Sequence, residues 1–328
     1  MRAYQLTGSV SPRLKAIERE DPIASPEHVV VDLRAASLNY RDIQEAKLGR
    51  QVIPLSDGAG VISAIGSTAG PWSVGDRVVI GFMPGWAEGP FTATKQATAL
   101  GGGTVDGVLA ERIRVPADAL ASMPADMTFD EAATLPCAGV TAWSALFERR
   151  PVQPGETVLL LGTGGVSIFA LQLAKAAGAR VIITSSSDDK LTRARTLGAD
   201  LTINYRVNPN WSAEVLSHTD GLGADLAVDV GGPGTLNETL KAVRHDGRIS
   251  LMGVLTGFDG PITTVDILRK RITLQGIYVG AVATLRALTK IGIRPVVDRV
   301  FSFSQADEAY SMMAAGEHFG KIVIRISE

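Results

Sequence analysis

The sequence is poor in cysteine, and Cys137 is the only one in its 328 residues. A disulfide within the chain is therefore impossible, and a zinc site built from several cysteines is excluded. No apolar run approaches the roughly 18 residues of a membrane span, so no membrane is expected as a partner. Residues Met1–Leu6 alternate like a strand and do not resemble a signal peptide. These features predict a cytoplasmic protein.

An excess of charge of one sign is also missing. The chain has 32 Lys and Arg against 34 Asp and Glu, and the densest basic run is only Arg269–Arg271. Nothing therefore points to nucleic acid as a partner, and a small-molecule substrate is expected instead. At about 150 residues per domain, the length suggests two domains.

The order of short apolar runs predicts the fold class. Runs broken by Gly, Pro and Asp fill residues 1–125 and indicate a mostly β catalytic domain. Thr128 and Glu131 have the spacing of a capping box. Strands and helices then alternate through residues 126–296, the pattern of a doubly wound α/β Rossmann domain with a parallel sheet. The tail, residues 297–328, is expected to return to the first domain. The strands expected in the Rossmann domain are Glu156–Leu161, Arg180–Thr184, Leu201–Tyr205, Asp225–Val230, Arg248–Val254 and Thr273–Val279.

A glycine-rich segment, Gly162–Ser167, lies between the first of these strands and a predicted helix. Glycine permits a sharp turn and a close approach of the backbone to a pyrophosphate, while the helix N-terminus offers free N–H groups. We therefore expect Gly162, Gly164, Gly165 and Val166 to bind a dinucleotide. The third glycine position holds Ser167, which is small enough for close packing of the helix on the strand.

The end of the second strand predicts which dinucleotide is bound. NAD enzymes usually carry an acidic residue there for the ribose 2′-hydroxyl. This chain has Ser185 and Ser186, with Lys190 beyond them, and these donors suit a 2′-phosphate. NADP is therefore expected, with NAD possible because Asp188 and Asp189 favour the opposite choice. A serine-rich helix cap without a phosphate is the alternative interpretation.

Several motifs follow one another in a set order: Gly75–Val78, Gly107–Glu111, Leu135–Ala142, the glycine loop and His318–Val323. In this order the chain resembles the medium-chain dehydrogenase/reductase superfamily over essentially its full length. Leu55–Gly60 is similar to a zinc-free subgroup close to quinone oxidoreductases and zinc-independent alcohol dehydrogenases. The resemblance implies that the β domain is GroES-like and that the protein is a homodimer, in which the strand Thr273–Val279 could extend one sheet across a twofold axis.

The same resemblance extends the list of expected cofactor contacts. It adds Thr141, Gly253 and Lys321 from the matching motifs. Asn204–Arg206 matches the segment where NADPH-dependent quinone reductases carry a tyrosine that helps to hold the 2′-phosphate. Tyr205 is therefore expected to contact the same phosphate.

The chain departs from the zinc-containing members of the superfamily at their ligand positions. Asn39 stands where they have a cysteine, and Leu55–Asp57 stands where they have Gly-His-Glu. Cys137 matches the third ligand position. One thiolate with an amide and a hydroxyl is not a zinc site, so no metal is expected. We interpret Cys137 as a small buried residue beside the nicotinamide pocket.

Without a metal, hydrogen-bond donors must stabilise the charge that a hydride acceptor gains, unless the acceptor spreads that charge itself. Quinones and enones do the latter. The candidate catalytic residues are Asn39 and Tyr40, with Asp42 behind them. A turn residue at Asn39 and a packed aromatic at Tyr40 remain equally open.

The leading hypothesis is a zinc-independent, NADP(H)-dependent oxidoreductase that transfers a hydride to a quinone or an α,β-unsaturated carbonyl. A zinc-free alcohol dehydrogenase or aldehyde reductase, with Tyr40 or a water as the proton relay, is the first alternative. A cofactor-binding structural or regulatory protein with little turnover is the second.

Overall fold

A computed structural model describes residues 1–9, 11 and 13–327 and separates the chain into two compact units. Unit 1 comprises Met1–Val140 and Val279–Glu328, and unit 2 comprises Thr141–Tyr278. The boundaries thus fall after residues 140 and 278, whereas the sequence placed them after 125 and 296. One reason is that helix α10 (Val282–Leu288) packs on strand β7 (Leu120–Ser122), where Arg286 Nε donates to Leu120 O at 2.9 Å.

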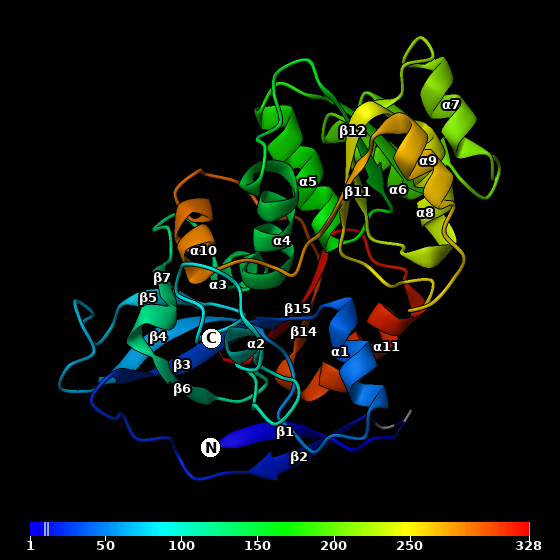
Figure 1. Ribbon diagram of the computed structural model, residues 1–328. Coiled ribbons are helices and arrows are strands. Elements are labelled where there is room, and N and C mark those ends of the chain that lie inside the picture. The colour runs from blue at the N-terminus through cyan, green and yellow to red at the C-terminus, as the bar shows by residue number, and fades with distance from the viewer. Residues whose placement is uncertain (10, 12, 328) are drawn as a thin grey trace. The chain divides into compact units, whose positions relative to one another are not determined.

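Unit 1 is built on a seven-stranded sheet with the order β14-β15-β3-β4-β5-β7, in which β6 also pairs with β3. A separate antiparallel pair is formed by β1 and β2. Strand β15 lies antiparallel to β3, with Val323 opposite Ser37, so the tail of the chain belongs to this sheet (Figure 1). The strands are β1 (Arg2–Leu6), β2 (Leu14–Glu18), β3 (His28–Ser37), β4 (Asp57–Ile65), β5 (Arg77–Ile80), β6 (Arg112–Pro116), β14 (Val297–Ser302) and β15 (Lys321–Arg325).

The helices of unit 1 are short. Helix α3 (Phe129–Ala132) begins with the predicted capping box: Thr128 Oγ1 accepts from the Glu131 N–H at 3.2 Å, and the Glu131 carboxylate accepts from the Thr128 N–H at 2.8 Å. A π-helix, η2 (Leu135–Gly139), follows it. Helix α1 (Tyr40–Lys47) contacts α11 (Ala306–Ala315), and α2 (Ala93–Gln96) lies in the long loop after β5.

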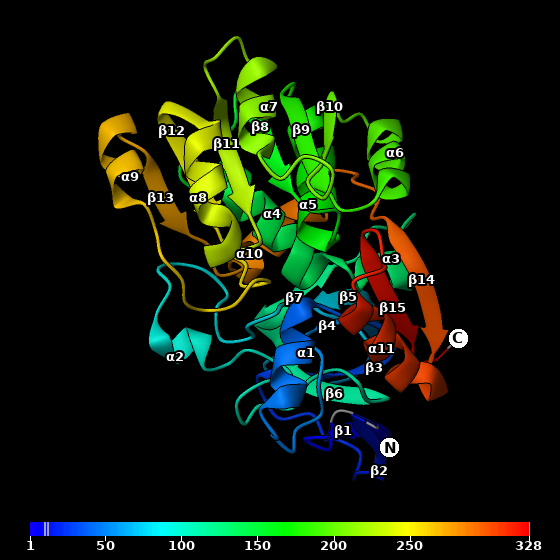
Figure 2. The same ribbon diagram turned by 90° about the vertical axis from the view of Figure 1, so that its right-hand side faces the viewer.

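Unit 2 contains a six-stranded, fully parallel sheet with the order β10-β9-β8-β11-β12-β13. Helix α5 packs on β8 and β9, and α8 packs on β11 and β12. Figures 1 and 2 show α5 on one face of the sheet, with α8 and α9 on the other. The predicted doubly wound α/β sheet is therefore confirmed. The strands are β8 (Thr157–Leu161), β9 (Arg180–Ser185), β10 (Leu201–Asn204), β11 (Ala224–Asp229), β12 (Val243–Leu251) and β13 (Thr273–Gly276).

The strand order creates the place for a ligand in unit 2. The chain starts the sheet at β8, moves outward to β9 and β10, and returns to the other side of β8 with β11. Ligands of such sheets bind outside the carboxyl ends of the strands where the order reverses.

None of the helices in the described part of the chain has the length and apolar character needed to cross a membrane. The helices of unit 2 are α4 (Val140–Trp143, which begins at the last residue of unit 1), a π-helix η3 (Ser144–Glu148), α5 (Gly165–Ala176), α6 (Asp188–Thr196), α7 (Trp211–Ser217), α8 (Pro233–Ala242) and α9 (Thr264–Lys270).

Candidate active site

The glycine loop of unit 2 lies at this switch point. Gly162 follows β8 directly and has φ +73°, a left-handed backbone that favours glycine. Gly164 is the N-cap of α5 and supplies no side chain to cap it. The first N–H groups of the helix, including those of Gly165 and Val166, are therefore available to an anion, and the helix dipole favours one there. This arrangement fits a dinucleotide pyrophosphate.

Ser167 explains how a residue other than glycine fits the third position of the loop. Its side chain is 1% exposed, and its Oγ donates to Leu161 O at 2.7 Å. The hydroxyl thus ties the start of α5 to the end of β8. The small side chain keeps the helix close to the strand, and its polar group is satisfied by the backbone.

The three serines at the end of β9 and just after it have different roles. Ser185 is 3% exposed, and its Oγ lies 3.3 Å from Thr163 Oγ1. Ser187 is the N-cap of α6 and accepts from the Lys190 N–H at 3.4 Å, so the cap interpretation applies to this residue. Ser186 lies between them and is half-buried. Of the three, Ser186 is therefore the best-placed hydroxyl for a ligand.

The other residues at this end of the sheet include acidic ones. Asp188 accepts from Asn204 Nδ2 at 2.9 Å, so one of its oxygens is held by the neighbouring strand. Tyr205 is 40% exposed, and its N–H donates to Ser185 O. Ser186 and the exposed Tyr205 both follow the ends of neighbouring strands, next to Asp188 and Asp189 at the start of α6.

Gly253 and Thr141 are placed differently. A Cβ at Gly253 would lie 1.7 Å from Val230 O, so close packing of the loops after β11 and β12 explains this glycine. Thr141, in α4, is 5% exposed. Sequence reasoning missed Asp229, which is fully buried and accepts from the N–H groups of Gly231 and Gly232 at 2.9 and 3.0 Å. A carboxylate just before a Gly-Gly pair at a strand end was the available signal.

A buried polar cluster occupies unit 1 at the start of α1. We call it the Lys321 cluster, and it consists of Asn39, Ser56, Asp57, Cys137 and Lys321. The Lys321 ammonium, with its side chain 3% exposed, donates to Leu38 O at 2.5 Å and to Asn39 Oδ1 at 2.6 Å, and it lies 3.8 Å from Asp57 Oδ2. The structure therefore places Lys321, which the sequence assigned to the cofactor, among the candidate catalytic residues.

Asp57 is held from three sides inside this cluster. Ser56 Oγ donates to Asp57 Oδ1 at 2.7 Å, and the Cys137 N–H, turned by the π-helix η2, donates to Asp57 Oδ2 at 3.2 Å. Complete burial raises the pKa of the Asp57 carboxyl, and the charge of Lys321 acts in the opposite direction. The Asn39 side chain, whose amide nitrogen lies close to this carboxylate, also lowers the pKa of Asp57 by hydrogen bonding.

The backbone before Asp57 is strained. Leu55, at the position where the zinc members have glycine, has φ +69° and is fully buried. Its carbonyl accepts from the Val108 N–H at 2.9 Å. Gly107 must lack a side chain there, because a Cβ would lie 2.0 Å from Leu55 O. In this chain the turn itself therefore carries Leu55, and the segment that packs against the turn carries Gly107.

The remaining candidate residues lie on α1. Tyr40 is its first residue and is 37% exposed. Asp42 is fully buried and forms the capping box of the helix, accepting from the Asn39 N–H at 2.6 Å. Burial raises the pKa of the Asp42 carboxyl from 3.8 to about 7. Asp42 therefore positions Asn39, whereas Tyr40 is the residue open to solvent.

The residue Cys137 is partly exposed, whereas its thiol group is buried. Burial of its thiol, and then the charge of Asp57, raise the pKa of the Cys137 thiol far above its ordinary value. Its surroundings in the protein therefore favour the neutral thiol over the thiolate, and they do not activate it as a nucleophile.

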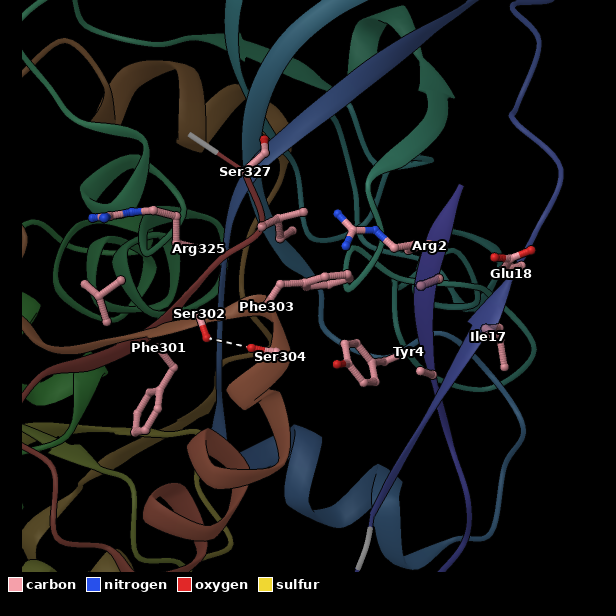
Figure 3. A pocket seen from close by; sticks show the side chains of 14 residues that line it. Arg2, Tyr4, Ile17, Glu18, Phe301, Ser302, Phe303, Ser304, Arg325 and Ser327 are labelled. Carbon is pink, nitrogen blue, oxygen red and sulfur yellow. Dashed lines mark hydrogen bonds between the residues drawn. The ribbon is translucent and has the colours of Figure 1, made fainter.

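A separate groove of about 760 Å³ in unit 1 shares no residue with the Lys321 cluster. In Figure 3 the rings of Tyr4 and Phe303 lie beside each other in this groove, and they pack edge to face with centroids 4.9 Å apart. Its arginines, Arg2 and Arg325, pair with Glu111 and Asp130. Because these charges are already compensated, the groove offers no reacting group, and we place the candidate active site at the Lys321 cluster. The groove is lined by Arg2, Ala3, Tyr4, Ala16, Ile17, Glu18, Val300, Phe301, Ser302, Phe303, Ser304, Arg325, Ile326 and Ser327.

Comparison with known proteins identifies the family of this chain. The family model of alcohol dehydrogenase GroES-like domains matches residues 25–125, and that of zinc-binding dehydrogenases matches residues 165–294. A zinc-type alcohol dehydrogenase-like protein of Schizosaccharomyces pombe is 43% identical over 331 residues, which cover 96% of this chain and 95% of that protein. The chain belongs to the medium-chain dehydrogenase/reductase superfamily.

Two solved structures of similar proteins extend over the full length of this superfamily member. One is a protein of Sinorhizobium meliloti 1021 described as an alcohol dehydrogenase, with 40% identity, a TM-score of 0.91 and coverage of 99% of this chain and 98% of that one. The other is described as an NAD-dependent alcohol dehydrogenase, with 32% identity, a TM-score of 0.91 and complete coverage of both chains.

The zinc that many members of the superfamily bind does not fit the residues of this one. Among the described residues, no group of three His, Cys, Asp or Glu side chains is arranged to hold a metal ion. The matching positions hold the Asn39 amide, the Ser56 hydroxyl and the protonated Cys137 thiol, with an ammonium group beside them. A divalent cation would lack its donors and would be repelled by Lys321.

Proposed function

We propose that the chain is a zinc-independent, NADP(H)-dependent oxidoreductase that transfers a hydride to a quinone or an α,β-unsaturated carbonyl. The observation that carries this proposal is the Lys321 cluster: an amide and a hydroxyl stand at positions that match zinc ligands, and an ammonium lies beside them. Hydrogen-bond donors stabilise a spread-out negative charge well, whereas an isolated alkoxide benefits more from a metal ion. An acceptor whose charge is delocalised therefore suits this site best.

The cofactor, when bound, supplies the hydride from its nicotinamide. Gly162 and the N-terminus of α5 hold the pyrophosphate, while Ser186 and Tyr205 donate to the 2′-phosphate. The N–H groups at the N-terminus of α5 support binding of a dinucleotide, and the hydroxyls of Ser186 and Tyr205 support NADP(H) as that dinucleotide. The similar protein described as NAD-dependent supports NAD as the alternative.

The residues of unit 1 act on the substrate. The Asn39 amide, whose Oδ1 accepts from Lys321, donates from Nδ2 to the carbonyl oxygen that becomes the enolate or phenolate oxygen. Hydride addition at the β-carbon of an enone leaves one negative charge, and one proton from water or from the exposed Tyr40 hydroxyl completes the reduction. A quinone takes up a hydride and a proton in the same way to give the hydroquinone.

Reversible reduction of aldehydes or ketones is the second candidate. It is favoured by the similar proteins, which are described as alcohol dehydrogenases or as alcohol dehydrogenase-like. The same Asn39 donor would then stabilise an alkoxide, with Tyr40 or a water as the proton relay.

A substrate panel tests the proposal. Quinones, enones, aldehydes and alcohols are each assayed with NADPH or NADH, or their oxidised forms, and kcat/KM is compared. We expect the highest value for a quinone or an enone with NADPH. A highest value for an alcohol and NAD would overturn both the substrate class and the cofactor. Ser186→Asp should repel the 2′-phosphate and move the NADPH/NADH ratio of kcat/KM toward NADH by roughly tenfold or more, with Ser186→Ala as the matched control.

A further inference from the structure

The long loop after β5 is closed at its base and braced from within. The Leu100 N–H donates to Phe82 O at 3.1 Å, so residues 83–99 form a closed loop, which we call the Trp86 loop. Inside it, Trp86 Nε1 donates to Gly89 O at 2.8 Å, and the Trp86 ring packs on that of Phe91 with centroids 4.7 Å apart. The loop thus holds Phe91, which is 42% exposed, in a fixed arrangement.

The Trp86 loop is anchored on two sides of the Lys321 cluster. The N–H of Val282, the first residue of α10, donates to Trp86 O at 2.9 Å, and α10 packs on the π-helix η2, which contains Cys137. At the base of the loop, a Cβ at Gly101 would lie 2.6 Å from Leu55 N, so the chain passes directly against the turn that leads into β4. The loop therefore connects two of the segments that build the cluster.

Arg41, the second residue of α1, holds the base of the loop from a third side. Its Nη1 donates to Leu100 O at 3.0 Å, and its guanidinium carbon lies over the Phe82 ring, 5.1 Å from the centroid. These are the two residues whose backbones close the loop. The Arg41 side chain is 20% exposed, and its Nη2 lies 3.7 Å from Glu45 Oε1 on the next turn of the helix. A planar guanidinium can stack on a ring and donate to a carbonyl at once, which an ammonium cannot.

The segment after the base leaves room for this guanidinium. A Cβ at Gly102 would lie 1.9 Å from Arg41 Nη2, so any larger residue there would displace the arginine. Arg41 directly follows the candidate catalytic residues Asn39 and Tyr40 in the chain. One side chain therefore joins the base of the loop to the segment that carries these residues.

We propose that Arg41 is a positioning residue of the candidate active site, and that it fixes the Trp86 loop as a wall against which the ring of a substrate packs. The aromatic pair of the loop suits a flat unsaturated ring, because aromatic side chains pack on such rings by face or edge. The role of the substrate ring rests on the proposed function. The role of Arg41 at the base of the loop rests on contacts within unit 1 alone.

Hydrogen exchange tests the role of Arg41. Arg41→Met keeps the aliphatic stem but removes both contacts at the base, so amide exchange in residues 83–99 should become about fivefold faster or more. Arg50→Met is the matched control, because Arg50 Nη1 pairs with the same Glu45 carboxylate at 2.6 Å and lies beyond the end of α1. It should leave exchange in the loop unchanged. Equal exchange in the two variants would overturn the role of Arg41.

Steady-state kinetics test the role of the loop. On the best ring-containing substrate of the panel, Arg41→Met should raise KM about fivefold or more and keep kcat within about twofold, because the loop binds the ring and takes no part in hydride transfer. Arg41→Lys keeps the charge and a donor but loses the planar contact with Phe82, so its KM should lie between the two. An open-chain acceptor should show little change. An unchanged KM, or an equal rise for the open-chain acceptor, would overturn the role of the loop.

A second variant and a binding measurement separate the possible failures. Gly102→Ala displaces the guanidinium without removing it and should change exchange and KM in the same direction, which keeps the test decisive if thermal unfolding shows that Arg41→Met does not fold. The Kd of NADPH should stay within about twofold, and a rise that matches the rise in KM would overturn the role of the loop. If no quinone or enone is reduced, the proposed function fails, while hydrogen exchange still decides whether Arg41 holds the loop.

Discussion

Asp42 makes the stability of unit 1 depend on pH. Burial raises the pKa of its carboxyl to about 7, whereas in the unfolded chain the group titrates near about 4. Between these values the folded chain keeps a proton that the unfolded chain has lost. The contribution of Asp42 to the free energy of unfolding is therefore full below about pH 4 and decreases as pH rises to about 7, by up to roughly 4 kcal/mol.

Asp42→Asn isolates this effect. The amide oxygen can still accept from the Asn39 N–H, so the helix cap remains while the titration disappears. We expect the free energy of unfolding of the wild type, measured in urea from pH 4 to 8, to decrease with pH relative to that of Asp42→Asn. Parallel profiles would show that the carboxyl is already ionised in the folded protein at pH 4.

The individual residues differ in how far the sequence could predict their roles. Asn39 was singled out because it stands at a ligand position, and the structure places it in the cluster. Lys321 was assigned to the cofactor, since nothing in the sequence shows that β15 lies beside the end of β3. The burial of Asp42 was equally hidden, because it depends on the packing of α1 against α11.

At the scale of elements, the N-terminus of α5 is the feature on which cofactor binding depends. Gly164→Val places a branched side chain at its N-cap, where the phosphates approach the N–H groups. We expect NADPH affinity to fall at least tenfold by fluorescence titration, with the fold retained by circular dichroism. Gly276→Ala, which adds a Cβ with no atom within 4 Å, is the control and should bind normally. Unchanged affinity in Gly164→Val would remove the pyrophosphate from this loop.

The elements themselves were predictable where burial is continuous. Strand β8 is apolar except for its first residue and is fully buried, and such strands between helices identified the parallel sheet. Helix α1 was not predicted, because few of its eight residues are apolar. The apolar segment Ala133–Phe147 is compatible with a single helix by its composition. In the structure, α4 is flanked by the π-helices Leu135–Gly139 and Ser144–Glu148, and the first of them presents the Cys137 N–H to Asp57.

For the whole molecule, we propose a homodimer formed through the edge of the unit 2 sheet. Strand β13 is the last strand of that sheet and is mostly exposed, with Leu274 37% exposed and Leu268 on α9 76% exposed. An open edge beside apolar side chains is a template for pairing with a second copy. The net charge of −2 opposes association only weakly.

Solution scattering tests this assembly. We expect a mass of twice the 34.5 kDa chain at micromolar concentration. Leu274→Lys with Leu268→Lys should shift the protein toward the monomer, because charged edges resist pairing. Leu222→Lys, at a residue that is 70% exposed and lies outside β13 and α9, should leave the dimer intact. A monomeric wild type would contradict the assembly.

The central claim is the proposal that this member of the superfamily transfers a hydride without zinc, with an amide at a position where other members have a zinc ligand. The most direct measurement is kcat with NADPH and the best quinone or enone, on protein whose zinc content is determined by elemental analysis before and after dialysis against a strong chelator. We predict well below one zinc per chain throughout and an unchanged kcat. About one tightly bound zinc per chain, with activity lost on its removal and restored on its return, would contradict the account.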